Sequence, residues 1–243
     1  MATNVAAVDI GTNSVLLLVA AWDSASGELS ALLERARITR LGRGVDRSRR
    51  LAPDAVERTL NCLAEFSELI RMHEVQHVDA VGTSAARDAE GAEEFLRAAE
   101  SILGVRPHII NGQREAALTF EGALCGLDAA GAVVACDIGG GSTEIVLGER
   151  DSAGASRLQH AVSVDVGSVR LTERYLTDDP ATAAQIGAAR QDVRNELRRI
   201  ERPPAGATFV GLAGTVTTLA AVKLGLERYD PARVHGVRLA AVD

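Results

Sequence analysis

Two short stretches of the sequence place an acid, glycines and hydroxyl side chains at the turn of an otherwise apolar hairpin. They are VAAVDIGTNSVLLLV at residues 5–19 and VVACDIGGGSTEIVL at residues 133–147. Backbone N–H groups of such a turn point into a concave space, and glycine permits the close approach that a phosphate group requires. Asp9 and Asp137 repel phosphate unless they hold a cation such as Mg²⁺ (or Mn²⁺) that bridges to its oxygens. The two turns therefore predict metal-assisted phosphate chemistry.

The two stretches follow one pattern. When residue 5 is placed over residue 133, an offset of 128, six of the fifteen positions are identical. A single Asp-Gly turn is common in β-hairpins for conformational reasons alone. Two such turns, one at the head of each half of the chain, indicate an internal duplication. Hydroxyl groups that could donate to phosphate occur in both copies, at Thr12, Ser14, Ser142 and Thr143.

The hairpins differ at the second residue after the serine, which is Leu16 in the first copy and Glu144 in the second. A carboxylate at the start of the apolar stretch Ile145, Val146 is costly to bury unless a cation or hydrogen-bond donors compensate. Glu144 is therefore a candidate ligand of a metal ion or of water. The alternative is a glutamate on the solvent-facing side of a half-buried strand.

The charge of the chain is unevenly distributed. The formal net charge of −7 argues against a general nucleic-acid-binding protein. Between Arg35 and Arg50, however, seven arginines stand against one acid, Asp46. A guanidinium group matches the oxygens of phosphate, and the alternative is a solvated basic loop without a specific ligand.

No part of the sequence predicts a membrane span or export. Among the 243 residues no apolar run approaches the ~18 residues of a spanning helix, and the N-terminus lacks a signal-peptide pattern. We therefore expect a cytoplasmic protein without a membrane partner. The three cysteines are widely spaced in apolar surroundings, which favours reduced core thiols over disulfides or a zinc site; they are Cys62, Cys125 and Cys136.

A similar series of elements surrounds each hairpin, and this series must position the turns. Apolar stretches predict three consecutive strands in each half, at 4–10, 14–22 and 28–40 and again at 132–137, 143–148 and 157–164. In the first half we then expect a helix from Pro53, a strand near 78–82, a helix near 90–103, a strand near 106–110 and a helix from about 113 to 126. In the second half we expect helices near 168–176 and 181–201, a strand at 208–212 and a helix at 215–224.

Two such turns heading duplicated halves resemble the actin, hexokinase and Hsp70 ATPase superfamily. More narrowly, the chain resembles the exopolyphosphatase and guanosine pentaphosphate phosphohydrolase family along nearly its whole length. The matching blocks are VDIGTNSVLLLV (8–19), RLGRGVD (40–46), VGTSAARDA (81–89), NGQREAALTFEGAL (111–124), DIGGGSTEIV (137–146), DVGSVRLTE (165–173) and GLAGTVTTLAA (211–221).

The resemblance implies an α/β fold of two duplicated actin-like, ribonuclease H-like lobes with a cleft between them. We expect the lobes at 1–126 and 127–243. Family chains continue past the point that corresponds to Asp243 with further helices, so the second lobe is expected to be cut short at its C-terminal end.

The resemblance also assigns roles to residues. Glu115 matches the general base that takes a proton from the attacking water, although by itself an acid in a first helical turn could simply complement the helix dipole. Arg87 matches an arginine that contacts the phosphate chain, and its alternative is a surface ion pair. Asp9, Asp137 and Glu144 match the acids around the metal.

Further residues match the family's phosphate-binding loops. These are Gly11, Thr12, Asn13 and Ser14 in the first turn, Gly139, Gly140, Gly141 and Ser142 in the second, Gly167, Ser168 and Arg170 in a second-lobe loop, and Gly214 with Thr215 at a helix start. For the last five, an ordinary α/β loop is the alternative.

The function expected from the resemblance is Mg²⁺-dependent (or Mn²⁺-dependent) hydrolysis of the terminal phosphoanhydride of inorganic polyphosphate, releasing orthophosphate. The alternatives are the same chemistry on guanosine pentaphosphate (pppGpp), a non-catalytic phosphate or nucleotide sensor, and a sugar or acetate kinase of the same superfamily. We expect no specific nucleic-acid partner. The resemblance allows for a homodimer, although no stretch of the sequence indicates a dimer face.

Overall fold

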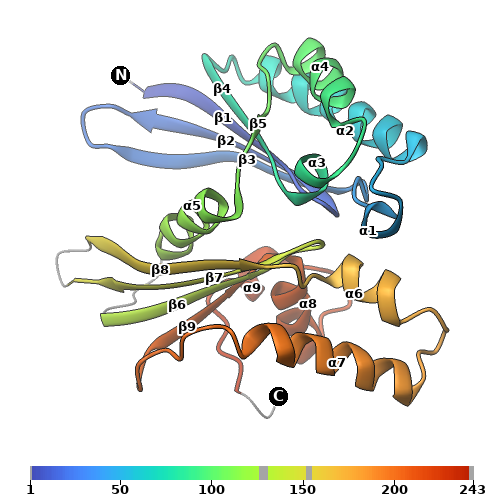
Figure 1. The fold of residues 1–243 in the computed structure, drawn as a ribbon. Coiled ribbons are helices and arrows are strands. Elements are labelled where there is room, and N and C mark those ends of the chain that lie inside the picture. The colour runs from blue at the N-terminus through green and yellow to red at the C-terminus, as the bar shows by residue number, and fades with distance from the viewer. Residues whose placement is uncertain (1, 126–130, 152–154, 241–243) are drawn as a thin grey trace. The chain divides into compact units, whose positions relative to one another are not determined.

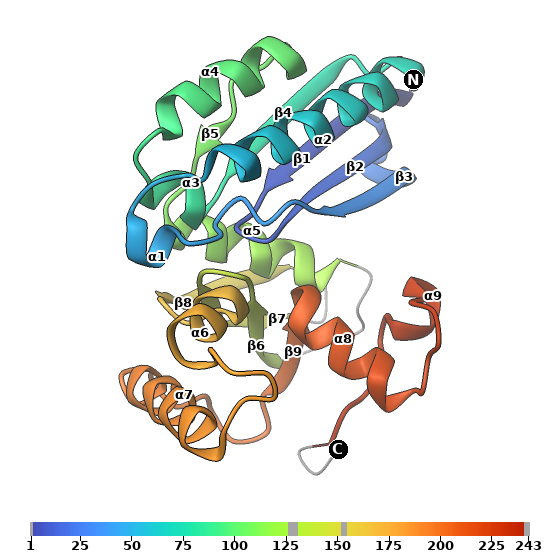
Figure 2. The ribbon, with the colours of Figure 1, turned by 90° about the vertical axis from the view of Figure 1, so that its right-hand side faces the viewer.

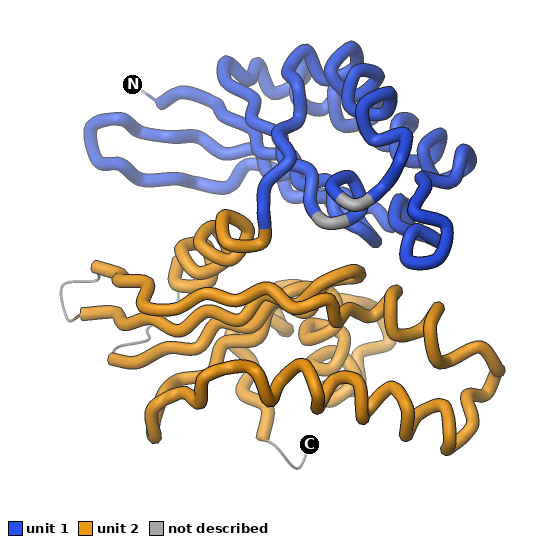
Figure 3. Tube along the Cα trace, viewed as in Figure 1, with its two compact units in different colours: residues 1–111 blue, residues 112–243 orange. Residues whose placement is uncertain are grey.

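The chain forms two compact units, Met1–Asn111 and Gly112–Asp243, which Figure 3 colours separately. The computed structural model describes residues 2–125, 131–151 and 155–240. Each unit contains one β-sheet and helices that pack on it, so the expected α/β class is confirmed. No helix within these ranges is long and apolar enough to cross a membrane.

The sheet of unit 1 has the strand order β3-β2-β1-β4-β5. The strands are β1 (Ala2–Ile10), β2 (Ser14–Asp23), β3 (Glu28–Ile38), β4 (His77–Gly82) and β5 (His108–Ile109). The first three form an antiparallel meander, β4 pairs parallel with β1, and β5 pairs parallel with β4. The carboxyl ends of β1 and β4 consequently lie at the same edge of the sheet.

Helices α2 and α4 cover one face of this sheet (Figure 1, Figure 2). The helices are α1 (Val45–Ser48), α2 (Pro53–Met72), α3 (Ser84–Asp88) and α4 (Ala92–Leu103). Alternate residues of β1 and β2, such as Ile10 and Leu17, pack with Leu63 and Phe66 of α2 and Phe95 of α4 in one buried cluster. This packing fixes the strand register and therefore the position of the turn between β1 and β2.

The sheet of unit 2 has the strand order β8-β7-β6-β9. The strands are β6 (Gly131–Ile138), β7 (Thr143–Arg150), β8 (Ser156–Val164) and β9 (Thr208–Leu212). The helices are α5 (Gly112–Leu124), α6 (Ser168–Tyr175), α7 (Ala183–Leu197), α8 (Ala213–Lys223) and α9 (Pro231–Val234). Helix α5 covers one face of the sheet, and α7 and α8 lie on the other side (Figure 1).

The expected duplication is visible in the topology. In both units a three-stranded antiparallel meander is extended by a parallel strand beside its first strand. The sequence offset of 128 places β1 over β6 and β2 over β7, and it superimposes the cross-strand pair Asp9 and Leu16 on the pair Asp137 and Glu144. The two candidate phosphate turns are therefore structural equivalents.

The division of the chain differs from the expected boundary at residue 126. Helix α5 belongs to unit 2 because its buried residues Ala116, Phe120 and Ala123 pack with Val133 and Val146 of the second sheet. Residue 126 itself lies outside the described ranges. The short helices α1, α3 and α9 were not predicted, and α7 ends at Leu197 rather than near 201.

Candidate functional site

The first turn closes β1 and β2 tightly. The ladder ends at the pair Ile10 and Val15, and the N–H of Gly11 donates to the carbonyl oxygen of Ser14 at 2.9 Å. A Cβ atom at position 11 would lie 2.9 Å from that same oxygen, so only glycine fits without a backbone shift. One carboxylate oxygen of Asp9, Oδ1, is buried at the end of β1.

The segment 39–42 supports this turn from one side. The carbonyl oxygen of Asn13 accepts hydrogen bonds from the N–H groups of Thr39 and Arg40 at 3.0 and 2.9 Å, and that of Thr12 accepts from Gly42 at 2.8 Å. A Cβ atom at position 42 would collide with the side chain of Thr12. Gly42, the first glycine of the RLGRGVD block, therefore allows the close packing that fixes the turn.

Arg87 lies at the same end of the sheet as the first turn. The N–H of Thr83, which precedes α3, donates to the carbonyl oxygen of Ile10 at 3.2 Å. The half-buried Arg87 side chain extends from α3 and donates to the carbonyl oxygen of Ile110 at 3.3 Å. The carboxyl ends of parallel strands are the usual place for ligands in α/β sheets, and unit 1 brings its predicted site residues together there.

The second turn, 139–142, is packed against the start of α6. The N–H of Gly139 donates to the carbonyl oxygen of Ser142 at 3.1 Å, and the N–H of Ser168 donates to the carbonyl oxygen of Gly139 at 3.0 Å. A Cβ atom at Gly167 would lie 2.5 Å from the carbonyl carbon of Gly140 and 2.7 Å from that of Gly141. The two predicted loops of unit 2 are therefore in direct backbone contact.

Arg170 stabilises the second turn. Its Nε donates to the carbonyl oxygen of Gly141 at 2.7 Å, and its Nη2 lies 3.4 Å from Oδ1 of Asp165. The N–H of Arg170 donates to the carbonyl oxygen of Gly140 at 3.1 Å. In this arrangement the arginine positions the loop backbone with its guanidinium.

The start of α8 reaches the same end of the second sheet. The hydroxyl of Thr215 donates to the carbonyl oxygen of Ile138, the last residue of β6, at 3.0 Å. A Cβ atom at Gly214 would meet no heavy atom within 4 Å. Three segments thus converge where β6 ends: the turn 139–142, the loop 167–170 and the first turn of α8.

Asp137, Glu144 and Ser163 are cross-strand neighbours. Asp137 of β6 is paired with Glu144 of β7, which is in turn paired with Ser163 of β8. Directly opposed residues of antiparallel strands share a face of the sheet, with Cβ atoms about 5 Å apart. Glu144 is 2% exposed, and its Oε1 accepts a hydrogen bond of 2.7 Å from the hydroxyl of Ser163. The solvent-facing alternative for Glu144 is therefore wrong.

Helix α5 begins over this row of polar residues. A Cβ atom at Gly112 would lie 2.5 Å from Cβ of Ser163, so the N-terminus of α5 packs directly on β8. Glu115 is in the first turn of the helix and has a buried oxygen, Oε2. Its neighbour Ala116 is fully buried against the α5-facing side of the sheet. Glu115 is thus in the first turn of a helix whose start packs on Ser163, the cross-strand neighbour of Glu144.

The opposed acids make this end of the sheet electronegative. The buried thiol of Cys136 has its pKa raised to about 11, first by burial and then by the charges of Asp137 and Glu144. Two carboxylates directly opposite each other are unfavourable unless a cation or a proton is shared between them. The site therefore suits a cation, and the thiol beside it stays protonated at neutral pH.

The two facing carboxylates suit Mg²⁺ better than a metal ion whose ligands are all protein side chains. Across the described ranges, no three histidine, cysteine, aspartate or glutamate side chains are close enough to hold a metal ion. Mg²⁺ commonly takes only one or two carboxylates and completes its shell with water and substrate phosphate oxygens. The facing pair Asp137 and Glu144 supplies that number of hard oxygen ligands within unit 2.

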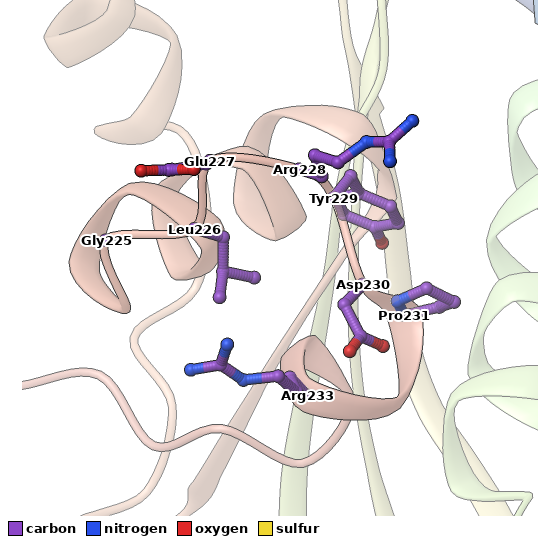
Figure 4. Close-up of a pocket in the computed structure, with 8 residues that line it drawn as sticks. All are labelled: Gly225, Leu226, Glu227, Arg228, Tyr229, Asp230, Pro231 and Arg233. Atoms are coloured by element: carbon purple, nitrogen blue, oxygen red, sulfur yellow. The ribbon is translucent and has the colours of Figure 1, made fainter.

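The open pocket drawn in Figure 4 is lined by none of the predicted site residues. It has a volume of about 720 Å³ and is lined by residues 225–231 and by Arg233. None of these residues belongs to the turns or to the acidic row. The pocket is therefore no part of the candidate site.

Sequence reasoning missed Ser163, Gly112 and Gly42. The signal for Ser163 was its place in the strand after Glu144, which becomes meaningful only when the register of the two strands is known. The two glycines have ordinary loop surroundings in the sequence and matter because of what they touch.

Comparison with known proteins places these residues in a family. Residues 18–239 match the model of the Ppx/GppA phosphatase family. The chain is 42% identical to Exopolyphosphatase 2 of Mycobacterium tuberculosis, over 99% of this chain and 77% of that protein. It is 31% identical to a guanosine-5'-triphosphate,3'-diphosphate pyrophosphatase of Photobacterium profundum, over 90% of this chain and 43% of that protein.

A solved structure supports the same relationship. The Ppx/GppA enzyme of Aquifex aeolicus is 38% identical, with a TM-score of 0.78 over 98% of this chain and 76% of that chain. The similarity extends over the described parts of both units.

Proposed function

Because the chain belongs to the Ppx/GppA phosphatase family, we propose that it releases orthophosphate from the end of inorganic polyphosphate, with Glu115 activating the attacking water. Family membership makes it a phosphoanhydride hydrolase with an actin-like ATPase fold. The relative from Mycobacterium tuberculosis, with 42% identity, is named an exopolyphosphatase, which favours polyphosphate as the substrate. The structural observation that carries the proposal is the packing of the start of α5, which bears Glu115, on the strand next to the paired Asp137 and Glu144.

Asp137 and Glu144 would hold the divalent cation, Mg²⁺ or Mn²⁺, with Asp9 of unit 1 assigned to the same role by the family resemblance. When bound, the cation neutralises charge on the phosphate oxygens and lowers the barrier to phosphoryl transfer. Ser163 holds Glu144 in place through its hydroxyl hydrogen bond. A carboxylate fixed in this way loses less conformational entropy when it binds a cation.

The turn 139–142 would bind the phosphate oxygens through its backbone N–H groups. Arg170 and the start of α6 hold the carbonyl oxygens of this turn through hydrogen bonds. The backbone of the turn is therefore fixed before an anion binds to its N–H groups. Ser142 would add its hydroxyl, and the start of α8 at Gly214 and Thr215 would add further N–H donors. We assign Gly11–Ser14 and Arg87 of unit 1 to phosphate binding on the family resemblance.

Glu115 would orient a water molecule and accept its proton as the terminal phosphorus is attacked. Phosphoryl transfer passes through a loose transition state, so little proton removal is needed before the anhydride bond breaks. A carboxylate of ordinary basicity is then sufficient if it is well positioned. The packing of Ala116 in the core of unit 2 supplies that positioning for its neighbour.

A second candidate substrate is pppGpp. The observation that favours it is the 31% identity to the Photobacterium profundum enzyme, whose name specifies a guanosine penta-phosphorylated substrate. The same phosphate-binding turns and the same base would serve it. The two candidates are distinguished by substrate preference.

The test compares phosphate release from tripolyphosphate, long-chain polyphosphate and pppGpp, with Mg²⁺ and with a chelator. We expect polyphosphate to be hydrolysed with the highest kcat/KM and activity to be lost on chelation. Release from pppGpp alone would favour the second candidate. Binding of these compounds without any release, in wild type and in Glu115→Gln alike, would identify a sensor and overturn the proposal.

A further inference from the structure

Three arginines in the segment 35–50 of unit 1 form neither an ion pair nor a side-chain hydrogen bond with any described residue. In the segment 35–50, Arg37, Arg43 and Arg50 form ion pairs with Glu65, Asp54 and Glu90, and Arg35 donates to the carbonyl oxygen of Glu34. The side chains of the remaining three are exposed and make no ion pair or hydrogen bond with any described residue. These unpaired arginines are Arg40, Arg47 and Arg49.

Two of the unpaired arginines occupy an unfavourable backbone conformation. Arg40 and Arg49 both have φ of 54°, in the left-handed region that glycine adopts freely and residues with a Cβ atom avoid. They are two of the four non-glycine residues with positive φ in the described ranges. Backbone strain of this kind concentrates at functional sites, although Arg49 is also the left-handed C-cap that ends α1.

The segment that carries these arginines is fixed to the first phosphate turn. The N–H of Arg40 donates to the carbonyl oxygen of Asn13 at 2.9 Å, and that of Gly42 donates to Thr12 at 2.8 Å. Helix α1 follows at once, with Val45 donating to Gly42 at 3.2 Å. Figure 1 shows α1 beside the end of the sheet where β1 ends. A chain of phosphates held at the turn would therefore meet unpaired guanidinium groups next.

We infer that Arg40, Arg47 and Arg49 bind the internal phosphates of a long polyphosphate chain whose end is held at the turn 11–14. This inference rests on the proposed function and adds to it a preference for long chains. Each internal phosphate carries a negative charge, so binding to several arginines releases counterions and raises affinity at low salt. Tripolyphosphate has only one internal phosphate, so it gains little from these residues.

The test is a triple variant, Arg40→Gly, Arg47→Ala, Arg49→Gly. Glycine suits the left-handed conformation at both strained positions, so the variant removes three charges without disturbing the backbone, and its thermal midpoint should not fall. An exposed guanidinium–phosphate contact contributes roughly threefold in affinity, so we expect KM for long-chain polyphosphate to rise about 30-fold. The kcat/KM for tripolyphosphate should change by less than about twofold.

Two matched controls separate charge from strain. Glu74→Gly relieves the same left-handed strain at φ 51° without touching an arginine, and Arg97→Ala removes an exposed positive charge on α4. Both should leave the chain-length preference unchanged. Equilibrium binding of long-chain polyphosphate, measured by titration calorimetry at two salt concentrations, is the second readout. Its salt dependence should be weaker in the triple variant.

Several results would overturn the inference. One is an unchanged KM and unchanged binding of long chains in the triple variant, and another is an equal loss with tripolyphosphate. A triple variant that loses binding of a single-stranded RNA oligomer while polyphosphate binding is intact would assign the arginines to nucleic acid. Failure of the wild type to hydrolyse any polyphosphate would refute the proposed function instead, and the calorimetric comparison would still decide the role of the arginines.

Discussion

Gly167→Ala should damage the candidate site by displacing the second turn. Gly167 is extended, with φ of −157°, so alanine causes no backbone strain there. Its Cβ atom would nevertheless lie 2.5 Å from the carbonyl carbon of Gly140. Real Cβ atoms stay at least 3.0 Å from such atoms, so the turn must move by about 0.5 Å, because both neighbours are backbone and cannot rotate away.

A displacement of this size is large for phosphoryl transfer. A misplacement of about 1 Å can cost roughly 100-fold in rate, so we expect kcat for phosphate release to fall about tenfold or more. Overpacking should also lower the free energy of unfolding by about 1–3 kcal/mol. Phosphate release and urea unfolding measure the two effects.

The matched control for this variant is Gly187→Ala. Gly187 lies within α7, and a Cβ atom there would meet no heavy atom within 4 Å. Alanine in a helix interior should raise stability by about 1 kcal/mol and leave activity unchanged. The reasoning is refuted if Gly167→Ala releases phosphate at the wild-type rate, because the turn would then tolerate the displacement or lack a role in binding.

Two further predictions concern the row of acids in unit 2. Ser163→Ala removes the hydrogen bond to the buried Glu144 and should lower the free energy of unfolding by about 2 kcal/mol in urea titrations. Ser101→Ala, at an exposed position of α4 where the hydroxyl donates to the carbonyl oxygen of Arg97, should have little effect. Equal stabilities of the two variants would contradict the buried-carboxylate interpretation. Cys136 and Cys62 each have a pKa raised to about 11, so they become thiolates only as the pH rises toward that value. Iodoacetamide at pH ~8 should therefore label the exposed Cys125 first. Labelling of Cys136 at the same rate, measured by mass spectrometry, would argue against its burial.

The strands and long helices could be predicted because their sequence patterns are strong. The apolar alternation of β1 and β2, and the helical spacing of Leu63, Phe66 and Ile70 in α2, express the burial that tertiary packing imposes. Short elements are different. Helices α1 and α3 have four and five residues, too few to show a period, and their backbone is held by contacts that the local sequence does not specify.

The candidate site could be predicted as a set of residue types, but its geometry could not. The hairpin pattern placed Asp137 and Glu144 on consecutive strands, whereas the place of Ser163 opposite Glu144 depends on the register between β7 and β8, which shifts between Leu147 and Gly148. Arg170 was expected to bind phosphate, and in the structure its Nε bonds to Gly141. Which arginines of the segment 35–50 are left without an ion pair could not be predicted. The acids that pair with Arg37 and Arg50 are Glu65 and Glu90, which are distant in sequence.

The most direct test of the account is polyphosphate hydrolysis in water enriched in heavy oxygen, with wild type and Glu115→Gln compared in the presence of Mg²⁺. We predict that each released orthophosphate carries one oxygen from solvent and that Glu115→Gln slows release by about 100-fold or more, with KM nearly unchanged. Release by Glu115→Gln at the wild-type rate would contradict the assignment of this carboxylate as the base that activates water.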